Sequence, residues 1–223
     1  MKRTGIPNVR ALIFDLDGTL IDSKRDLVAS VNAMLGKVGR GELPEDVIAS
    51  YVGSGASVLV KRALGTEASE DEVKKALAIF LEHYEEHKLD TTRAYPGVPE
   101  TLPKLGHYFL AVLTNKPSRA SVRILEGLGL SGYFKSIYGG NSFETKKPDP
   151  LGAQTILREF DVAPGQALMV GDSEVDVQTA RNAGMRALVV NYGFGTHDRE
   201  AHPADVYLDK FEDLLLLLNH QTG

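Results

Sequence analysis

The sequence lacks cysteine, and it contains no long apolar run. The absence of cysteine excludes a disulfide framework, a thiolate zinc site and a cysteine nucleophile. The longest apolar block, Leu214 to Leu218, is far too short to cross a membrane, and Met1 to Arg10 contains no segment resembling a signal peptide. We therefore expect a cytoplasmic protein with no membrane partner.

Basic residues are also outnumbered by acidic ones. The chain has 25 Lys and Arg residues and 30 Asp and Glu residues, which gives a formal net charge of −5. An acidic chain of this kind has no electrostatic footprint for nucleic acid, so we expect no nucleic-acid partner. The composition includes 43% hydrophobic and 25% charged residues, which is typical of a packed globular protein. Its 223 residues suffice for one large domain or for a core with a smaller inserted one.

The order of the expected elements divides the chain into two units. An apolar run from Val9 to Phe14, interrupted only by Arg10, predicts a buried parallel strand. Every following segment up to residue 89 is helical in pattern, and Ser23 with Asp26 predicts a capping pair for the first of these helices. From residue 109 onward strands alternate with helices, which is typical of βαβ units.

We therefore expect an α/β fold, with a Rossmann-like parallel-sheet core formed by residues 1–22 and 92–223 and an inserted all-helical cap formed by residues 23–91. The expected helices of the cap include 44–51, 56–64 and 69–89. In the core we expect strands at 109–114, near 137, at 167–170 and at 186–190, and helices at 118–128, 150–160 and 175–183.

Two carboxylates, Asp15 and Asp17, directly follow the first strand, with Gly18 next. Ligands of an open parallel sheet bind outside the carboxyl ends of its strands, so these side chains should project into a crevice. Two acids this close together repel each other, and a bound divalent cation is the natural compensation. The alternative is a solvated turn, because Asp-Gly is also an ordinary turn signal.

Groups that can bind phosphate follow the second strand of the expected core. Thr114, Asn115 and Lys116 offer hydroxyl, amide and ammonium donors, although Thr114 could instead cap the next helix. Lys147 precedes a rigid proline pair, where it could neutralise charge on a transferring phosphoryl group, whereas Lys146 suits a solvated loop.

Asp172 and Asp176 lie where another strand runs into a helix. Asp172 is at the strand end, as Asp15 is, and hard oxygen ligands from adjacent strand ends are what magnesium prefers. The alternative for Asp172 is a helix N-cap. Asp176, one turn further on, could orient a ligand or simply place a favourable charge near the helix N-terminus.

Together these segments resemble the four ordered motifs of the haloacid dehalogenase superfamily. The segments are 15–19 (DLDGT), 114–115 (TN), 147–150 (KPDP) and 171–176 (GDSEVD), and the resemblance extends over nearly the whole chain. Among its branches the chain most resembles the phosphoglycolate phosphatase-like group, which carries a helical cap inserted after the first motif. The cap segments 53–56 (GSGA) and 60–64 (VKRAL) and the string 114–117 (TNKP) are similar to that group.

The resemblance implies a phosphoric monoester hydrolase that works through an aspartyl-phosphate intermediate. Asp15 would be the nucleophile, and Asp17 the general acid and base. Thr114 and Lys147 would hold the phosphoryl oxygens, with Asn115 helping.

The resemblance also implies Mg²⁺ as the cofactor, held by Asp15, by the backbone carbonyl of Asp17 and by Asp172, with Asp176 in support. Lys116 and the cap residues Gly53, Lys61 and Arg62 are candidates for binding the rest of the substrate, although adjacent Lys61 and Arg62 cannot both face the same way on a helix.

The implied substrate is a small phosphorylated metabolite, with 2-phosphoglycolate first among the candidates. Pyrophosphate, nucleotides and sugar phosphates are alternatives. The chain could act as a monomer or a homodimer.

Related activities would require residues different from those in this chain. A dehalogenase would not need Asp17. A sugar phosphomutase would carry an arginine and a histidine where this chain has Ala56 and Leu27. A phosphonate-cleaving hydrolase would need a Schiff-base lysine, for which Lys61 is a candidate. A phospho-signalling receiver module, the non-enzymatic alternative, would place an aspartate where this chain has Thr114.

Overall fold

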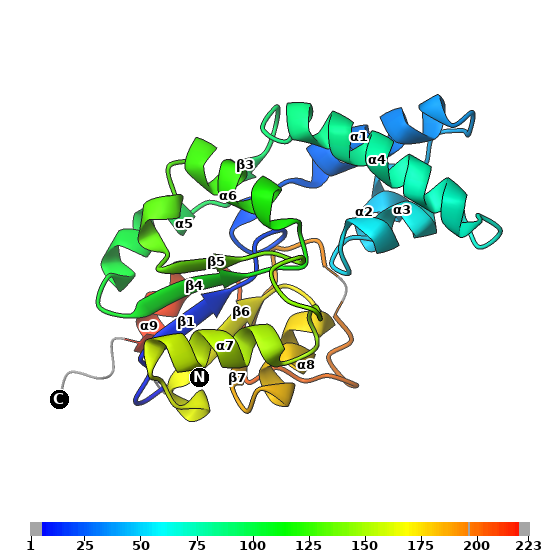
Figure 1. Cartoon of the computed structure of the whole chain (residues 1–223). Coiled ribbons are helices and arrows are strands. Elements are labelled where there is room, and N and C mark those ends of the chain that lie inside the picture. Colours follow the sequence, from blue (N-terminus) through cyan, green and yellow to red (C-terminus); the bar gives the residue numbers. More distant parts are fainter. Residues whose placement is uncertain (1–5, 196, 219–223) are drawn as a thin grey trace.

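A six-stranded parallel sheet forms the centre of the protein, whose structure is a computed structural model describing residues 6–195 and 197–218 (Figure 1). The first strand, β1 (Ala11–Phe14), lies between β4 (Phe109–Leu113) and β6 (Ala167–Gly171). All of β1 is buried, which explains its unbroken apolar run. The sheet order is β5 (Ser136–Tyr138), β4, β1, β6, β7 (Arg186–Val190) and β8 (Val206–Leu208).

Each face of the sheet has its own hydrophobic core, because successive side chains of a strand point to opposite faces. Leu12 and Phe14 pack into one core, together with residues of α5, α6 and α9. Ala11 and Ile13 pack into the other, beneath α7 and α8 (Figure 1). The bounds of these helices are α5 (Val98–Thr101), α6 (Ser118–Gly127), α7 (Leu151–Phe160), α8 (Glu174–Asn182) and α9 (Asp213–Leu218), and short 3-10 helices lie at η1 (Leu102–Leu105), η2 (Ser131–Tyr133) and η3 (Pro164–Gln166).

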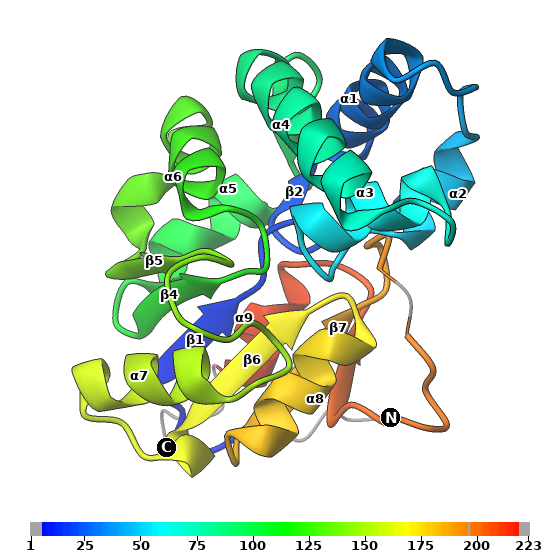
Figure 2. The same ribbon diagram turned by 45° about the vertical axis from the view of Figure 1, so that its right-hand side comes forward.

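Four consecutive helices within residues 24–87 stand together beyond the carboxyl ends of the strands (Figure 2). Within this cap, α4 packs against both α1 and α3. Ser69 caps α4, and its capping box with Glu72 satisfies backbone N–H groups at the helix start. The α/β class and the inserted helical cap are confirmed. The cap helices are α1 (Lys24–Lys37), α2 (Glu45–Ser50), α3 (Ala56–Leu64) and α4 (Glu70–His87).

A two-stranded antiparallel ribbon joins the cap to the core. It consists of β2 (Ile21–Asp22) and β3 (Arg93–Ala94), with Asp22 opposite Arg93. Neither strand was expected, because two residues are too few to leave a periodic pattern in a sequence. We propose that this ribbon marks the boundary between cap and core, near the predicted positions 22 and 92.

The predicted capping pair at the start of α1 is wrong. Ser23 occupies the N-cap position, but its side chain makes no cap hydrogen bond and donates instead to Asp17. Asp26 accepts hydrogen bonds from the backbone and hydroxyl groups of Thr91 and Thr92, at distances of 2.6–3.1 Å. Through these hydrogen bonds the buried Asp26 ties the first cap helix to the returning chain.

Asp26→Ala should lower the free energy of unfolding by about 2 kcal/mol, because the buried donors of Thr92 lose their acceptor and the exposed Thr91 loses its hydrogen bonds to the first cap helix. Burial acts to raise the pKa of Asp26, but the hydrogen bonds from Thr91 and Thr92 outweigh it and lower that pKa. Because the pKa of Asp26 is lower in the folded protein than in the unfolded chain, Asp26 stabilises the fold at pH values above the ordinary pKa of a carboxyl group. This stabilisation is lost as the pH falls through the folded-state pKa. Urea unfolding should therefore show a smaller difference in the free energy of unfolding between variant and parent at pH 3 than at pH 7. Exposed Asp46→Ala is the control, and an equal loss in both variants would contradict the prediction.

The C-terminal part of the described chain completes the sheet and covers it. The apolar block 214–218 belongs to α9, where Leu214, Leu217 and Leu218 are buried in the core. Neither α9 nor β8 was expected from the sequence. None of the helices within residues 6–195 and 197–218 combines the length and apolarity that a membrane span requires.

Candidate active site

The polar residues singled out in the sequence come together at the carboxyl ends of β4, β1 and β6. Phe14, the last residue of β1, is in register with Val112 of β4 and Val170 of β6. The loops that carry Asp15, Thr114 and Asp172 therefore leave the sheet side by side. This is where an open parallel sheet places its ligand site.

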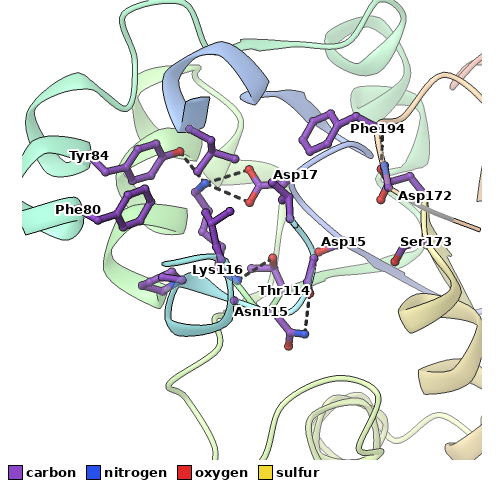
Figure 3. A pocket seen from close by; sticks show the side chains of 18 of the residues that line it. Asp15, Asp17, Phe80, Tyr84, Thr114, Asn115, Lys116, Asp172, Ser173 and Phe194 are labelled. Atoms are coloured by element: carbon purple, nitrogen blue, oxygen red, sulfur yellow. Dashed lines mark hydrogen bonds and ion pairs between the residues drawn. The ribbon is translucent and has the colours of Figure 1, made fainter. Parts of the chain in front are cut away.

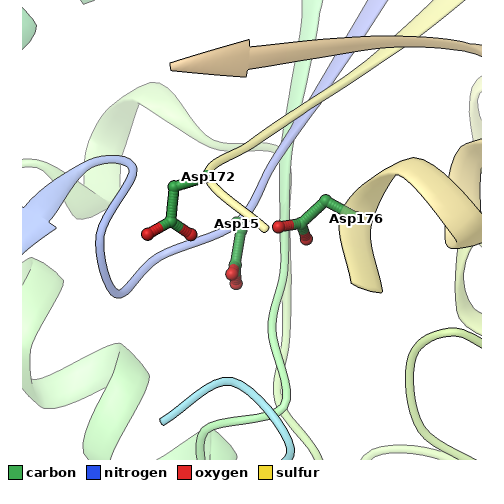
Figure 4. A group of neighbouring side chains, drawn as sticks. All are labelled: Asp15, Asp172 and Asp176. Atoms are coloured by element: carbon green, nitrogen blue, oxygen red, sulfur yellow. The ribbon is translucent and has the colours of Figure 1, made fainter. Parts of the chain in front are cut away.

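Three buried carboxylates form a cluster at this edge (Figure 4). Asp15, Asp172 and Asp176 each offer one oxygen, and these oxygens lie within 4.8 Å of one another. Burial, followed by the charge of Asp176, raises the pKa of Asp15 to about 6, although nearby Lys147 opposes this. Burial, together with the charges of Asp176 and Asp15, raises the pKa of Asp172 well above its ordinary value. The cluster is thus short of positive charge, and its hard oxygen donors fit a divalent cation.

Lys147 is the cation that the chain itself supplies to this cluster. Its Nζ lies 2.9 Å from Asp15 Oδ1 and 2.6 Å from Asp176 Oδ1, and its side chain is 2% exposed. Burial would lower the pKa of Lys147, but the charges of Asp15 and Asp176 outweigh this and raise it. Lys147 therefore stays charged next to the nucleophile candidate.

Asn115 joins this lysine to the cap. Its Oδ1 accepts from the backbone N–H of Lys147, while its Nδ2 donates to the carbonyls of Lys147 and Gly53. Gly53 belongs to the loop between α2 and α3, so one core side chain holds two loops of the site. Both Asn115 and Gly53 line the cavity between cap and core.

Asp172 is held by backbone groups from a loop that the sequence did not indicate. Its Oδ2 accepts from the N–H groups of Phe194 and Gly195, at 3.1 and 2.7 Å. Gly18 must be a glycine, because its φ is +79° and an added Cβ would lie 1.9 Å from Asp172 Oδ2. The N-cap alternative for Asp172 is wrong, since Ser173 occupies that position.

Ser173 and Asp176 cap the start of α8 together. Asp176 Oδ2 accepts from the backbone N–H of Ser173 at 3.2 Å and from its hydroxyl at 2.7 Å. Asp176 Oδ1 is left for Lys147. Asp176 therefore contacts both the helix start and Lys147, and its predicted part in holding a metal stays a prediction.

Asp17 points away from the carboxylate cluster and towards the cap (Figure 3). Its carboxylate accepts from Lys116 Nζ at 2.9 and 3.1 Å and from the hydroxyl of Ser23. Lys116 Nζ also lies 2.6 Å from the hydroxyl of Tyr84, on α4. Burial would lower the pKa of Lys116, but Asp17 and Tyr84 outweigh this and raise it. The sequence marked Ser23 only as a helix cap, and it did not single out Tyr84, because a contact across 32 residues leaves no local pattern.

The cavity between core and cap is mainly apolar. Thr114 lines it, and its hydroxyl accepts from the backbone N–H of Lys116 at 3.2 Å. Lys61 and Arg62 do not line it, and both are exposed on α3. The structure therefore does not bring these two predicted substrate-binding cations to the site. The apolar lining comes from Leu27, Val52, Ala56, Leu59, Phe80, Leu81 and Phe194.

The family model for haloacid dehalogenase-like hydrolases matches residues 12–190, a span that includes every strand-end group of the site. The chain belongs to the haloacid dehalogenase-like hydrolase family. A phosphoglycolate phosphatase of Psychrobacter arcticus is 40% identical to this hydrolase over 209 residues, which cover 89% of the chain and 91% of the relative. Phosphoglycolate phosphatase 1 of Pseudomonas aeruginosa is 40% identical over 217 residues, covering 92% of the chain and 78% of the relative.

A solved structure resembles this hydrolase over nearly its full length. The crystal structure of a predicted phosphoglycolate phosphatase from Haemophilus somnus has a TM-score of 0.88 and 34% identity, and covers 95% of this chain and 98% of that one. The family, the fold and the class of enzyme expected from the sequence, a phosphoric monoester hydrolase, are confirmed.

Proposed function

We propose that this hydrolase cleaves the phosphoric monoester of a small metabolite, 2-phosphoglycolate before others, with Mg²⁺ as cofactor and Asp15 as the nucleophile. The observation that carries the proposal is the buried cluster of Asp15, Asp172 and Asp176 next to Lys147, of which Asp15 and Asp172 line the cavity between core and cap. The relatives support the choice of substrate, because those from Psychrobacter arcticus and Pseudomonas aeruginosa are phosphoglycolate phosphatases.

The carboxylate cluster supports a divalent metal at this position. Asp15, Asp172 and the backbone carbonyl of Asp17 would hold Mg²⁺, and Asp176 would support the site through Lys147 and Ser173. When bound, the ion would screen Asp15 from the anionic substrate and stabilise charge on the phosphoryl oxygens.

In the first step, an oxygen of Asp15 attacks phosphorus and the ester P–O bond breaks. The products are an aspartyl phosphate and an alkoxide, and Asp17, which enters this step protonated, gives its proton to the alkoxide. The ammonium of Lys147 lies 2.9 Å from Asp15. It stabilises the charge on the phosphoryl oxygens while the phosphoryl group is transferred to Asp15. The hydroxyl of Thr114 lines the same cavity and would hold one of these oxygens.

In the second step, Asp17 takes a proton from water, and the resulting hydroxide attacks phosphorus. The bond to Asp15 breaks, phosphate leaves, and both aspartates return to their starting states. The cap covers the cavity and keeps bulk water from the intermediate. Asn115 positions Lys147 and the Gly53 loop in both steps, through its three hydrogen bonds.

The other activities weighed from the sequence have less support. A Schiff-base role for Lys61 in phosphonate cleavage has none, because Lys61 is exposed and lies away from the cavity. The cytoplasmic setting and the choice between monomer and homodimer stay predictions from the sequence.

The test is the release of inorganic phosphate from 2-phosphoglycolate. We expect turnover with Mg²⁺, loss of activity in EDTA and recovery when Mg²⁺ is restored. Mg²⁺ alone should also raise the melting temperature of the parent protein, because the ion neutralises buried carboxylates, and Asp172→Asn should abolish this rise. Activity that persists in EDTA, or an unchanged Mg²⁺ effect in Asp172→Asn, would refute the metal assignment. Absence of turnover with 2-phosphoglycolate but turnover of another phosphomonoester would refute the substrate alone.

A further inference from the structure

We propose that Tyr84 of the cap and Lys116 of the core form a positioning pair that orients the carboxylate of Asp17 for proton transfer. The inference rests on the proposed role of Asp17 as acid and base, and it gives Lys116 a different task from binding the substrate. It makes the orientation of the proton donor depend on a residue of the cap.

The ammonium of Lys116 is held by two side chains of the protein. It lies 2.9 and 3.1 Å from the two oxygens of Asp17 and 2.6 Å from the Tyr84 hydroxyl. An ammonium group has three N–H donors, and one carboxylate and one hydroxyl of the protein fix the direction in which it points. Lys116 is 5% exposed and lines the cavity between cap and core, so both of its contacts are shielded from bulk water. This geometry favours a positioning role over recognition of a second substrate anion.

Tyr84 is held firmly enough to serve as a fixed point. Its ring is 3% exposed and stacks on Phe80, with 5.6 Å between the ring centroids and 6° between the ring planes. Both residues lie on α4, which packs against α1 and α3. Lys116 Nζ also lies 4.5 Å from the centroid of the Tyr84 ring, so the ring and its hydroxyl both attract the ammonium.

Asp17 in turn has little freedom to rotate. Ser23 at the start of α1 donates to Oδ1, and Lys116 donates to both oxygens. Proton transfer requires the oxygen of Asp17 to lie within hydrogen-bond reach of the ester oxygen, and small displacements cost large factors in rate. Loss of the Tyr84 or Lys116 contact should therefore slow the reaction in the way that loss of Asp17 does, but less severely.

The test compares substrates whose leaving groups differ in their need for a proton. Ethyl phosphate and 2-phosphoglycolate release an alkoxide that must be protonated, whereas p-nitrophenyl phosphate releases a stable phenolate. The variants are Tyr84→Phe, Lys116→Met and Asp17→Asn. The controls are Tyr133→Phe and Lys74→Met, which change an exposed tyrosine and an exposed lysine outside the cavity. Melting temperatures establish that each variant is folded, and Tyr84→Phe keeps the stacked ring.

We expect kcat/KM for both alkyl phosphates to fall about 10-fold in Tyr84→Phe and about 100-fold in Lys116→Met, with little change for p-nitrophenyl phosphate. The controls should match the parent protein. Equal losses on all three substrates would overturn the inference in favour of a merely structural contact, and a loss confined to 2-phosphoglycolate would overturn it in favour of carboxylate binding by Lys116. If Asp17→Asn itself shows no dependence on the leaving group, the proposed role of Asp17 fails as well.

Discussion

Asp15→Asn should lower kcat for 2-phosphoglycolate by about 10⁴-fold or more, because an amide cannot form the aspartyl phosphate. The substitution is nearly isosteric, and it removes one of three mutually repelling carboxylates. Burial and Asp176 raise the pKa of Asp15 to about 6 despite Lys147, so the ionised side chain is costly to the fold. The variant should therefore fold as well as the parent. Released phosphate and a thermal melt measure the two effects separately.

A chemical trap makes this first result specific to the nucleophile. The parent enzyme is quenched and denatured with acid during turnover of ³²P-labelled substrate. The label should then remain on the peptide that contains Asp15, and the Asp15→Asn variant should retain none. Asp17→Asn keeps the nucleophile and should still become labelled. Normal turnover in Asp15→Asn, or label on a different peptide, would disprove the assignment.

Lys147→Met should damage both catalysis and stability. Its removal leaves Asp15 and Asp176 buried without their common partner, and the free energy of unfolding should fall by about 3 kcal/mol. For a chain of this length, that loss corresponds to roughly 10 °C in melting temperature. The phosphoryl oxygens also lose a fixed positive charge, so kcat should fall about 10³-fold. Melting in EDTA and phosphate release in saturating Mg²⁺ report the two losses.

Lys146→Met is the matched control, because Lys146 is the adjacent residue, carries the same charge and is exposed. It should change the melting temperature little and leave kcat within a small factor of the parent value. Equal effects of the two substitutions would mean that general charge, and not the contacts of Lys147, is responsible.

The strand-end residues of the site could be predicted from the sequence because the signal for each is local. A buried parallel strand appears as a short apolar run, and the polar group after it must emerge at the sheet edge, as Asp15, Thr114 and Asp172 do. The long run of helical pattern before the second strand likewise revealed the inserted cap.

Contacts between distant segments could not be predicted in this way. The sequence marks Lys116 as a phosphate or substrate ligand, but its partners Asp17 and Tyr84 are 99 and 32 residues away. The N–H groups of Phe194 and Gly195 that hold Asp172 carry no side-chain signature at all. The spacing of Ser23 and Asp26 fits a helix cap. In the structure, however, Ser23 hydrogen-bonds to Asp17, and Asp26 accepts from two threonines of the returning chain.

The small ribbon of β2 and β3 also bears on how such proteins diversify. Because Asp22 and Arg93 are opposite each other in an antiparallel pair, the two ends of the segment that carries the four cap helices are only about 5 Å apart. A tight turn, or a module of quite different size, could bridge that gap without shifting any strand of the sheet. Substrate preference can therefore evolve by exchanging the inserted module, while the carboxylate cluster and Lys147 are kept below it.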